Sequence, residues 1–324
     1  MNKVVALAVA GLAIATSIFV FTRPTGDMPT YSLTLAVSET PLSAPLLIAD
    51  EMGMFQEEHL SVTIDMCNGG NQCFQMMADG QADLATCSTS VAMFRAFTPD
   101  QFQIFGSFAT SGNDIKLIAR KQKSLTSLGQ LRQFRAGVVK GSASEYFFDS
   151  LMILGGDSAA PIQKHYYPPE QLAQALSDNQ VDVVSIWEPW SYLLLKSQPD
   201  AELLDTKGLY QLSFNLAGKP ITSQTQLDKL VALFKALEKA NVFISEHPAR
   251  AKAILSARLG VQTDQIDWGW DDYHFQISMG NQLLSSLEDQ AQWAVQSGVI
   301  EARLPPDFRT LIDPRPLNLL RNSE

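Results

Sequence analysis

Strand-like and helix-like segments alternate from Tyr31 to Trp187, and the connections between them are short. Strands are expected at 31–37, 61–66, 82–87, 115–119, 135–139, 162–167 and 181–186. This alternation, with helices between the strands, is typical of parallel sheets covered by helices. The second half of the series repeats the order of the first, so we expect an α/β fold of two similar lobes. The expected lobes are residues 31–114 plus 213–324, and residues 115–212.

The C-terminal part predicts one returning strand followed by helices. The apolar segment 212–217 is expected to bring the chain back to the first lobe. Thr225 and Asp228 have the spacing of a capping box, which predicts the start of a helix. A further helix is expected to begin at Pro248 and to end before Gly260.

Length and charge narrow the class of protein. The 324 residues exceed one average domain, and the hydrophobic fraction of 46% is enough for a full core. The formal net charge of -10 argues against binding to nucleic acid, whose phosphates attract basic surfaces.

The N-terminus has the pattern of a targeting segment. Lys3 precedes an unbroken apolar run from Val4 to Phe21, and Arg23 follows it. The run is long for a signal peptide and just long enough to span a bilayer. Residues 1–27 are therefore expected to be either a cleaved signal peptide or an uncleaved membrane anchor. Either one places the rest of the chain outside the cytoplasm: periplasmic, secreted, or anchored to the outer face of the inner membrane.

Three cysteines follow in the first lobe, and disulfides form readily in exported proteins. Cys67 and Cys73 would close a short loop, which makes them the first choice for a bridge, with Cys87 as a free thiol near the cleft. The spacing alone does not determine the connectivity. A soft-metal site of three thiolates is the alternative, although the sequence has no CxxC and no interleaved histidine. We expect no metal and no cofactor.

The segment 134–148 reads as strand, Gly/Ser turn and helix. Such a turn aims backbone N–H groups and the positive end of a helix at one point, which suits an anion. Gly141, Ser142, Ala143 and Ser144 are the candidate anion-binding residues. The alternative is that the serines only cap the helix. A nucleotide is not expected, because neither GxGxxG nor a Walker pattern is present.

Several motifs in this order resemble the nitrate/sulfonate/taurine family of solute-binding proteins of ABC importers. The resemblance covers roughly residues 31–300 and rests on 42–55, 69–71, 77–84, 137–144, 180–190 and 246–248. It implies the type II clamshell of periplasmic binding proteins, with two mostly parallel sheets flanked by helices and two hinge strands. It also implies no catalysis, a small anionic or zwitterionic ligand such as a sulfonate, taurine or nitrate, and an ABC permease as partner.

Ligands of open α/β sheets bind at the carboxyl ends of the strands, which places five loops around one cleft. The candidate ligand-binding residues in these loops are Ser38, Thr40, Pro41, Asn71, Cys87, Ser88, Thr89, Gly141, Ser142, Ala143, Ser144, Trp187 and Glu188. Lys140 is the one cation in the set, so directed dipoles are expected to bind an oxyanion. Trp187 is either an apolar wall, a face for an ammonium group, or core. Glu188 either binds an amine or faces water.

Two other classes remain open. The same resemblance extends to pyrimidine synthases of thiamine biosynthesis, so the chain could bind a thiamine-pyrimidine precursor or act as a synthase-like enzyme. A membrane-tethered sensor is the third candidate. Gene neighbours that encode a permease and an ATPase would favour the solute-binding protein over both.

Overall fold

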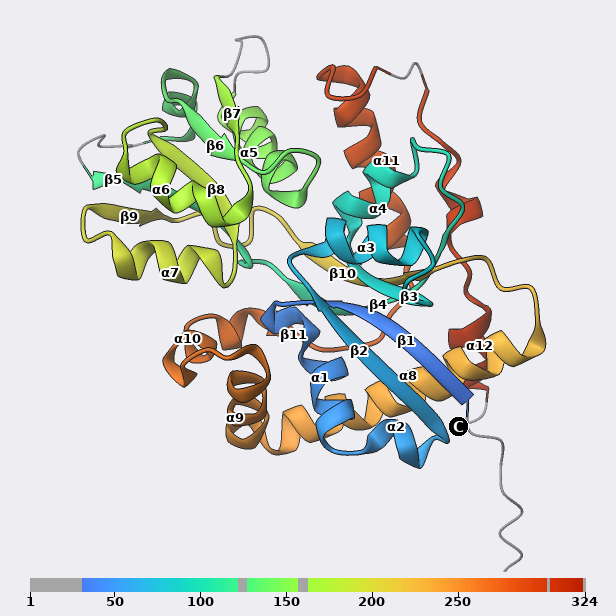
Figure 1. Cartoon of the computed structure of the whole chain (residues 1–324). Coiled ribbons are helices and arrows are strands. Elements are labelled where there is room, and N and C mark those ends of the chain that lie inside the picture. The colour runs from blue at the N-terminus through green and yellow to red at the C-terminus, as the bar shows by residue number, and fades with distance from the viewer. Residues whose placement is uncertain (1–30, 122–126, 157–162, 302–303, 323–324) are drawn as a thin grey trace, which may run out of the picture.

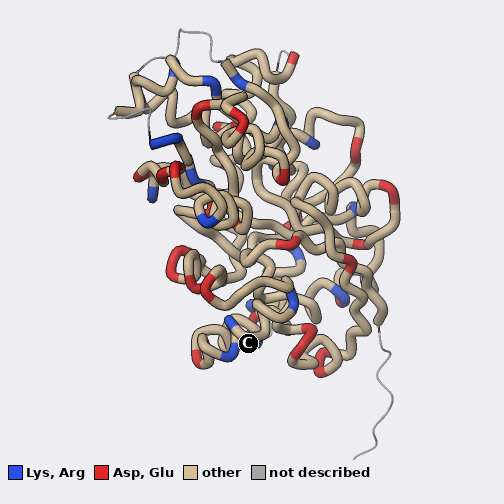
Figure 2. Tube along the Cα trace, turned by 60° about the vertical axis from the view of Figure 1, so that its left-hand side comes forward, with Lys and Arg blue, Asp and Glu red and all other residues tan. Residues whose placement is uncertain are grey.

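The computed structural model describes residues 31–121, 127–156, 163–301 and 304–322, which form two α/β lobes (Figure 1). The expected signal peptide or anchor at 1–27 lies outside the described residues. Within the described ranges, no helix is both long and apolar enough to cross a bilayer. Acidic and basic residues are interspersed over the trace (Figure 2).

The first lobe is built on a six-stranded sheet in the order β11-β4-β10-β3-β1-β2. Its strands are β1 (Tyr31–Ser38), β2 (Leu60–Cys67), β3 (Leu84–Ser88), β4 (Gln103–Ser111), β10 (Leu212–Gly218) and β11 (Tyr273–His274). β1 is parallel to β2 and β3, whereas β10 is antiparallel to β3 and β4, and β11 is antiparallel to β4.

The second lobe holds a five-stranded sheet in the order β7-β6-β8-β5-β9. Its strands are β5 (Ile115–Arg120), β6 (Ala136–Val138), β7 (Lys164–Tyr166), β8 (Val183–Trp187) and β9 (Ala201–Leu204). β6 is parallel to β7 and β8, and β5 is antiparallel to β8 and β9.

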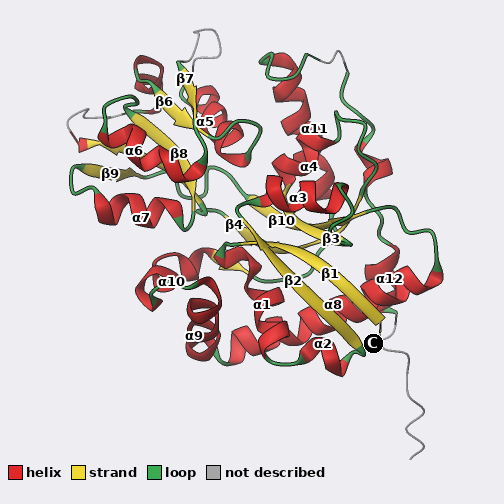
Figure 3. Ribbon diagram, in the orientation of Figure 1, coloured by secondary structure: helices red, strands yellow, loops and turns green. Residues whose placement is uncertain are grey.

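Helices cover both faces of each sheet (Figure 3). Below the first sheet in this view are α1 (Ala44–Glu51), α2 (Met54–Glu57), α8 (Gln224–Glu246), α9 (Pro248–Leu259), α10 (Thr263–Gly269) and α12 (Arg315–Arg321), and above it are α3 (Gly70–Ala78), α4 (Thr89–Arg95) and α11 (Asn281–Gln296). The second sheet carries α5 (Ala143–Leu154), α6 (Leu172–Ser177) and α7 (Trp190–Ser197). The short 3-10 helices are η1 (Pro41–Ser43), η3 (Leu128–Gln133), η4 (Pro169–Gln171), η5 (Trp270–Asp272) and η6 (Phe308–Leu311).

The alternation of side chains along β1 shows why this strand needs helices on both faces. Leu33, Leu35 and Val37 are buried in the apolar cluster that includes α1 and α8. Ala36 points to the opposite face and belongs to the cluster that includes α3 and α11. Successive strand residues point to opposite faces, so the buried part of β1 from Leu35 to Ser38 is covered by a helix layer on each side.

The chain passes between the lobes twice, after β4 and before β10. These two crossings lie side by side, because the Gly208 N–H donates to the Gly112 carbonyl oxygen at 2.8 Å and Leu212 pairs with Ser111. The strand expected at 212–217 is confirmed as β10, which joins the first sheet.

The two-lobed α/β fold expected from the sequence is confirmed, but three details differ. Both sheets are mixed rather than mostly parallel, because β10 and β5, which adjoin the crossings, run against their neighbours. β4 and β9 were not expected from the sequence. The capping box consists of Ser223 and Gln226 rather than Thr225 and Asp228, so α8 begins earlier than predicted.

Candidate ligand-binding site

A cavity of about 220 Å³ lies where the two lobes meet. Residues of both lobes line it: Ser38, Thr40, Leu42, Asn68, Gly69, Gly70, Asn71, Gln72, Ser88, Val91, Asp114, Val139, Ser142, Ala143, Pro169, Trp187, Leu212 and Phe214. The carboxyl ends of β1, β2 and β3 supply much of the first-lobe wall, as expected for an open α/β sheet. Seven of the predicted residues line the cavity: Ser38, Thr40, Asn71 and Ser88 from the first lobe, and Ser142, Ala143 and Trp187 from the second.

The first-lobe wall carries polar side chains among apolar ones and lies close to the second lobe. The Asn71 side-chain amide donates to the Gly141 carbonyl oxygen at 3.3 Å, a bond between the lobes. A Cβ on Gly69 would lie 3.7 Å from the Trp187 indole. Asn71, near the start of α3, thus bonds the second lobe, and Gly69, in the loop after β2, lies near Trp187.

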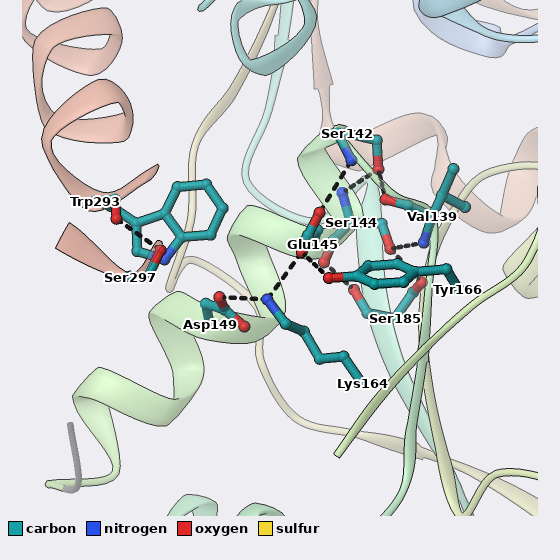
Figure 4. Close-up of polar contacts among 11 residues, drawn as sticks. Val139, Ser142, Ser144, Glu145, Asp149, Lys164, Tyr166, Ser185, Trp293 and Ser297 are labelled. Atoms are coloured by element: carbon teal, nitrogen blue, oxygen red, sulfur yellow. Dashed lines mark hydrogen bonds and ion pairs between the residues drawn. The ribbon is translucent and has the colours of Figure 1, made fainter. Parts of the chain in front are cut away.

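Most polar groups of the Gly/Ser turn before α5 form hydrogen bonds within the turn or with β8 (Figure 4). The Ser142 hydroxyl donates to the Val139 carbonyl oxygen at 2.7 Å and accepts the Ser144 N–H at 3.2 Å. The Ser144 hydroxyl donates to the Ser185 carbonyl oxygen at 2.6 Å and accepts the Val139 N–H. Ser144 is fully buried, and its hydroxyl joins α5 to β8 rather than facing the cavity. The capping alternative thus describes Ser142, whereas Ser144 ties α5 to β8.

A carboxylate of the chain already occupies the positive end of α5. Glu145, in the first helical turn, is fully buried and accepts the Gly141 N–H at 3.0 Å. It also bonds Lys164 Nζ at 2.8 Å and the Tyr166 hydroxyl at 2.7 Å. Because the helix N-terminus is partly neutralised by this acid, it attracts a ligand anion less than the sequence pattern predicted. The prediction that Gly141 binds the anion is therefore corrected, because its N–H bonds Glu145 and does not point to the cavity.

Lys164 is shared by two carboxylates. It bonds Asp149 Oδ2 at 2.9 Å as well as Glu145. Burial raises the pKa of Asp149, and the Lys164 charge opposes that rise. Burial also raises the pKa of Tyr166 to about 12, assisted by its hydrogen bond to Glu145. The Lys164 charge is thus already paired within the protein. Lys140 is exposed, and its ammonium group lies over the Tyr166 ring at 5.6 Å. Neither lysine lines the cavity.

Glu188 is buried and does not face water. Its carboxylate lies 2.9 Å from Lys116 Nζ, a cation that is equally buried on β5. It also accepts the Trp268 Nε1–H at 2.9 Å and the Tyr192 N–H at 3.2 Å. These partners fill the acceptor capacity of the carboxylate, so Glu188 is a structural ion-pair residue and not a wall of the cavity.

Asp114 is the acidic residue of the cavity wall, and it was not predicted. It lies at the first crossing, directly before β5, and is 3% exposed. Burial raises its pKa from 3.8 to about 7; the nearby Lys116 charge opposes the rise, the Glu188 charge adds to it, and the Tyr273 hydroxyl, which donates at 3.4 Å, opposes it. Sequence reasoning missed Asp114 because β4, the strand that leads to it, was not expected.

This burial predicts a pH effect on stability. The folded protein holds the Asp114 proton up to about pH 7, whereas the unfolded chain releases it near pH 3.8, so stability from this group falls as pH rises between those values. Asp114→Asn cannot ionise, and we expect its urea midpoint to rise relative to wild type between pH 4.5 and 7.5. Equal pH slopes for the two proteins would contradict the assignment.

The predicted disulfide is confirmed. Cys67 and Cys73 are bonded, with a Cα–Cα distance of 5.5 Å, so the alternative of three thiolates on one metal is wrong. No group of acidic, cysteine and histidine side chains suited to a metal occurs among the described residues. Cys87 is fully buried beside Cys73 and Phe74, and burial raises its pKa to about 12. It is core and does not line the cavity, which corrects its place among the ligand-binding residues.

Thiol counting tests this arrangement. We expect one reactive thiol per chain when unreduced protein is denatured, because only Cys87 is free. We expect almost none in the native state, because the thiolate is the reactive form and a buried thiol with a raised pKa rarely forms it. Three thiols under denaturing conditions would contradict the bridge, and fast labelling of native protein would contradict the burial.

Pro41 and Thr89 also lie behind the wall. Pro41 begins η1 and is buried. The Thr89 hydroxyl donates to the Ser213 carbonyl oxygen at 3.4 Å and accepts the Asn215 side-chain amide at 3.1 Å. Both residues support the structure behind the cavity wall: the Pro41 ring is buried, and the Thr89 hydroxyl bonds other groups of the protein.

The comparisons with known proteins agree with this architecture. The chain is 25% identical over 221 residues to the putative aliphatic sulfonates-binding protein of Bacillus subtilis (strain 168), a match that spans 66% of each protein, just under two thirds of the relative's length. The alkanesulfonate-binding protein SsuA from Xanthomonas axonopodis pv. citri bound to MOPS superposes with a TM-score of 0.77 at 15% identity, covering 89% of this chain and 99% of that one.

Other solved structures show that the fold carries more than one activity. The periplasmic aliphatic sulphonate binding protein SsuA from Escherichia coli matches with a TM-score of 0.74 at 15% identity, over 87% of this chain and 97% of that one. The desulfurization enzyme DSZB matches with a TM-score of 0.65 at 15% identity, over 90% of this chain and 99% of that one.

A family model matches more of the sequence than the Bacillus subtilis relative does. The model of the NMT1-like family matches residues 26–257, which is more than half of the chain and includes every residue named above as lining the cavity. The chain therefore belongs to the NMT1-like family.

Proposed function

We propose that the protein is an extracytoplasmic solute-binding protein that captures a small anionic or zwitterionic solute, of the sulfonate class, and delivers it to an ABC permease. The observation that carries the proposal is the cavity of about 220 Å³ lined by both lobes. A ligand held by two lobes stabilises their closed arrangement, and a partner that recognises this arrangement can distinguish loaded from empty protein. The names of the sulfonate-binding relatives favour the ligand class.

The composition of the wall favours binding over catalysis. Hydroxyl and amide groups of Ser38, Thr40, Asn71 and Ser88 line it together with the apolar face of Trp187. No cysteine, histidine or lysine occurs among the described residues of the wall, so it offers no nucleophile paired with a base. A role like that of the desulfurization enzyme is therefore the less favoured alternative.

The proposal also includes the lobe boundaries, the role of the N-terminal segment and the ligand-contacting residues, which the fold alone does not test. The first lobe is taken as residues 31–114 plus 213–324 and the second as 115–212, with the two crossings as hinges. Residues 1–27 are taken as the export signal or the anchor. The ligand-contacting residues are taken as Ser38, Thr40, Asn71, Ser88, Ser142, Ala143 and Trp187.

A thermal-shift screen followed by calorimetry tests the proposal. Ethanesulfonate, 2-hydroxyethanesulfonate, taurine and nitrate are added to the purified protein, because a ligand that binds only the folded state raises the melting temperature. At a concentration of about 100 times Kd the stabilisation is about 2.7 kcal/mol. At least one sulfonate is expected to bind.

Trp187→Ala is the matching variant, and Trp190→Ala is its control, since both side chains are half-buried and Trp190 does not line the cavity. We expect affinity to fall at least tenfold in Trp187→Ala and to stay unchanged in Trp190→Ala. The absence of any shift with all four compounds, or equal losses in the two variants, would overturn the proposed ligand class and site.

A further inference from the structure

The cavity has an unusual charge for a site that receives an anion. Asp114 is the only ionisable residue among the described residues that line it. A simple anion would meet hydroxyl and amide dipoles, one buried carboxyl group, and no cation on the wall. Burying a negative ligand beside a carboxylate is unfavourable unless the carboxyl group is protonated or a positive group lies between them.

Lys116, the basic side chain near Asp114, already has partners of its own. Lys116 Nζ is paired with Glu188 at 2.9 Å, donates to the Asn113 carbonyl oxygen at 2.6 Å, and lies 6.0 Å from the Trp268 ring centre. Within the described ranges, no basic side chain forms an ion pair with Asp114. The charges of Lys116 and Glu188 offset each other, so the ionised state of Asp114 is left without a counterion of its own.

The surroundings of Asp114 leave room for one more hydrogen bond. Oδ1 accepts the Tyr273 hydroxyl at 3.4 Å, and Oδ2 has no hydrogen-bond partner among the described residues. The side chain is more than nine-tenths buried, and it lines the cavity. Oδ2 is therefore free to accept a hydrogen bond from a donor that a ligand supplies.

We propose that the ligand carries an amino group and that the Asp114 carboxylate receives it, with the Trp187 ring available as a face for the same group. This deepens the proposed function: the hydroxyl and amide wall binds the oxyanion, and Asp114 makes the site selective for amino-bearing solutes over plain anions. Charge-assisted hydrogen bonds and cation–π contacts both strengthen when water is excluded.

The raised pKa of Asp114 agrees with this role. A positive amino group next to the carboxyl favours its ionised form, so binding is expected to release a proton when measured below about pH 7. The other charged or titratable groups that face Asp114 are Lys116 of β5, Glu188 after β8, Tyr273 of β11 and Tyr210, which precedes β10. Burial raises the pKa of both tyrosines well above their usual value, so neither titrates with Asp114 near neutral pH.

The experiment compares matched ligand pairs by calorimetry on the folded protein. Taurine and 2-hydroxyethanesulfonate differ by an ammonium and a hydroxyl group, and 4-aminopyrimidine and pyrimidine form a second pair without a sulfonate. The variants are Asp114→Asn and, as a control that removes the same charge outside the cavity, Asp65→Asn. We expect the amino-bearing member of a pair to bind wild type and Asp65→Asn about tenfold to a hundredfold tighter than its partner. Asp114→Asn should lose this preference.

The outcomes separate this inference from the proposed function. Binding of ethanesulfonate or 2-hydroxyethanesulfonate without a preference for taurine would overturn the inference and leave the proposed function standing. Binding of 4-aminopyrimidine through Asp114, with no sulfonate bound, would support the inference and overturn the sulfonate class. The inference also fails if no amino-bearing probe binds, or if Asp114→Asn keeps the wild-type preference.

Discussion

Replacing Lys116 with methionine is expected to lower the free energy of unfolding by about 3–5 kcal/mol, the cost of leaving one charge of a buried pair alone. Lys116 and Glu188 are both about 2% exposed, and their charged atoms are 2.9 Å apart. Without the cation, Glu188 keeps its Trp268 and Tyr192 donors but has no counterion. Urea unfolding at pH 7.5 measures the loss.

Two further variants separate the buried charge from other effects of the substitution. Lys116→Met combined with Glu188→Gln removes both charges, and we expect it to recover most of the stability. Lys239→Met breaks surface ion pairs of the exposed Lys239 with Glu57 and with the half-buried Glu58, and it should cost about 1 kcal/mol or less. A loss below 1 kcal/mol for Lys116→Met would show that the pair is not the buried support described here.

Asn215→Ala is expected to cost about 2–4 kcal/mol, because it leaves several buried polar groups without partners. Asn215 is fully buried in β10. Its oxygen accepts the Ser107 hydroxyl of β4 at 2.6 Å, and its amide donates to the Cys87 carbonyl oxygen and to the Thr89 hydroxyl. One side chain thus joins three strands directly behind the cavity wall.

Thermal and urea unfolding of this variant test the assignment, with Asn318→Ala on the exposed side of α12 as the control. The control should stay within about 0.5 kcal/mol of wild type, as surface substitutions usually do. If Asn215→Ala were as mild as the control, the network around β10 would not be a stabilising element.

Local pattern was enough for much of the fold. The helix expected at 143–154 was found with those bounds, because Ser142 caps it and Phe147 and Leu151 follow helical spacing. The Cys67–Cys73 bridge was found because a short loop limits how far two cysteines can separate. The returning strand at 212–217 was found because Leu212, Phe214 and Leu216 alternate along it and enter the apolar core.

The predictions from sequence were wrong where the identity of a residue does not reveal its hydrogen-bond partner. The Gly/Ser turn has the composition of an anion site, yet Glu145 reaches back to the Gly141 N–H, and Ser144 bonds β8. The Ser144–Ser185 contact joins residues 41 apart in the chain, so no local pattern contains it. The Glu145–Gly141 contact is local, and the composition of the turn did not reveal it. The capping box at Ser223 was misplaced by two residues because Thr225 and Asp228 carry the same spacing.

The sequence by itself determined the two α/β lobes, the family, and the loops that surround the cavity, since strand periodicity, helix spacing and strand-end loops are local properties. Only the tertiary structure decided which side chains in those loops line the cavity. Lys116, Glu188 and Asp114 are polar residues whose roles depend on burial, and burial is set by which elements pack over them. The same packing makes Glu188 an ion-pair partner and leaves Asp114 on the cavity wall without a counterion.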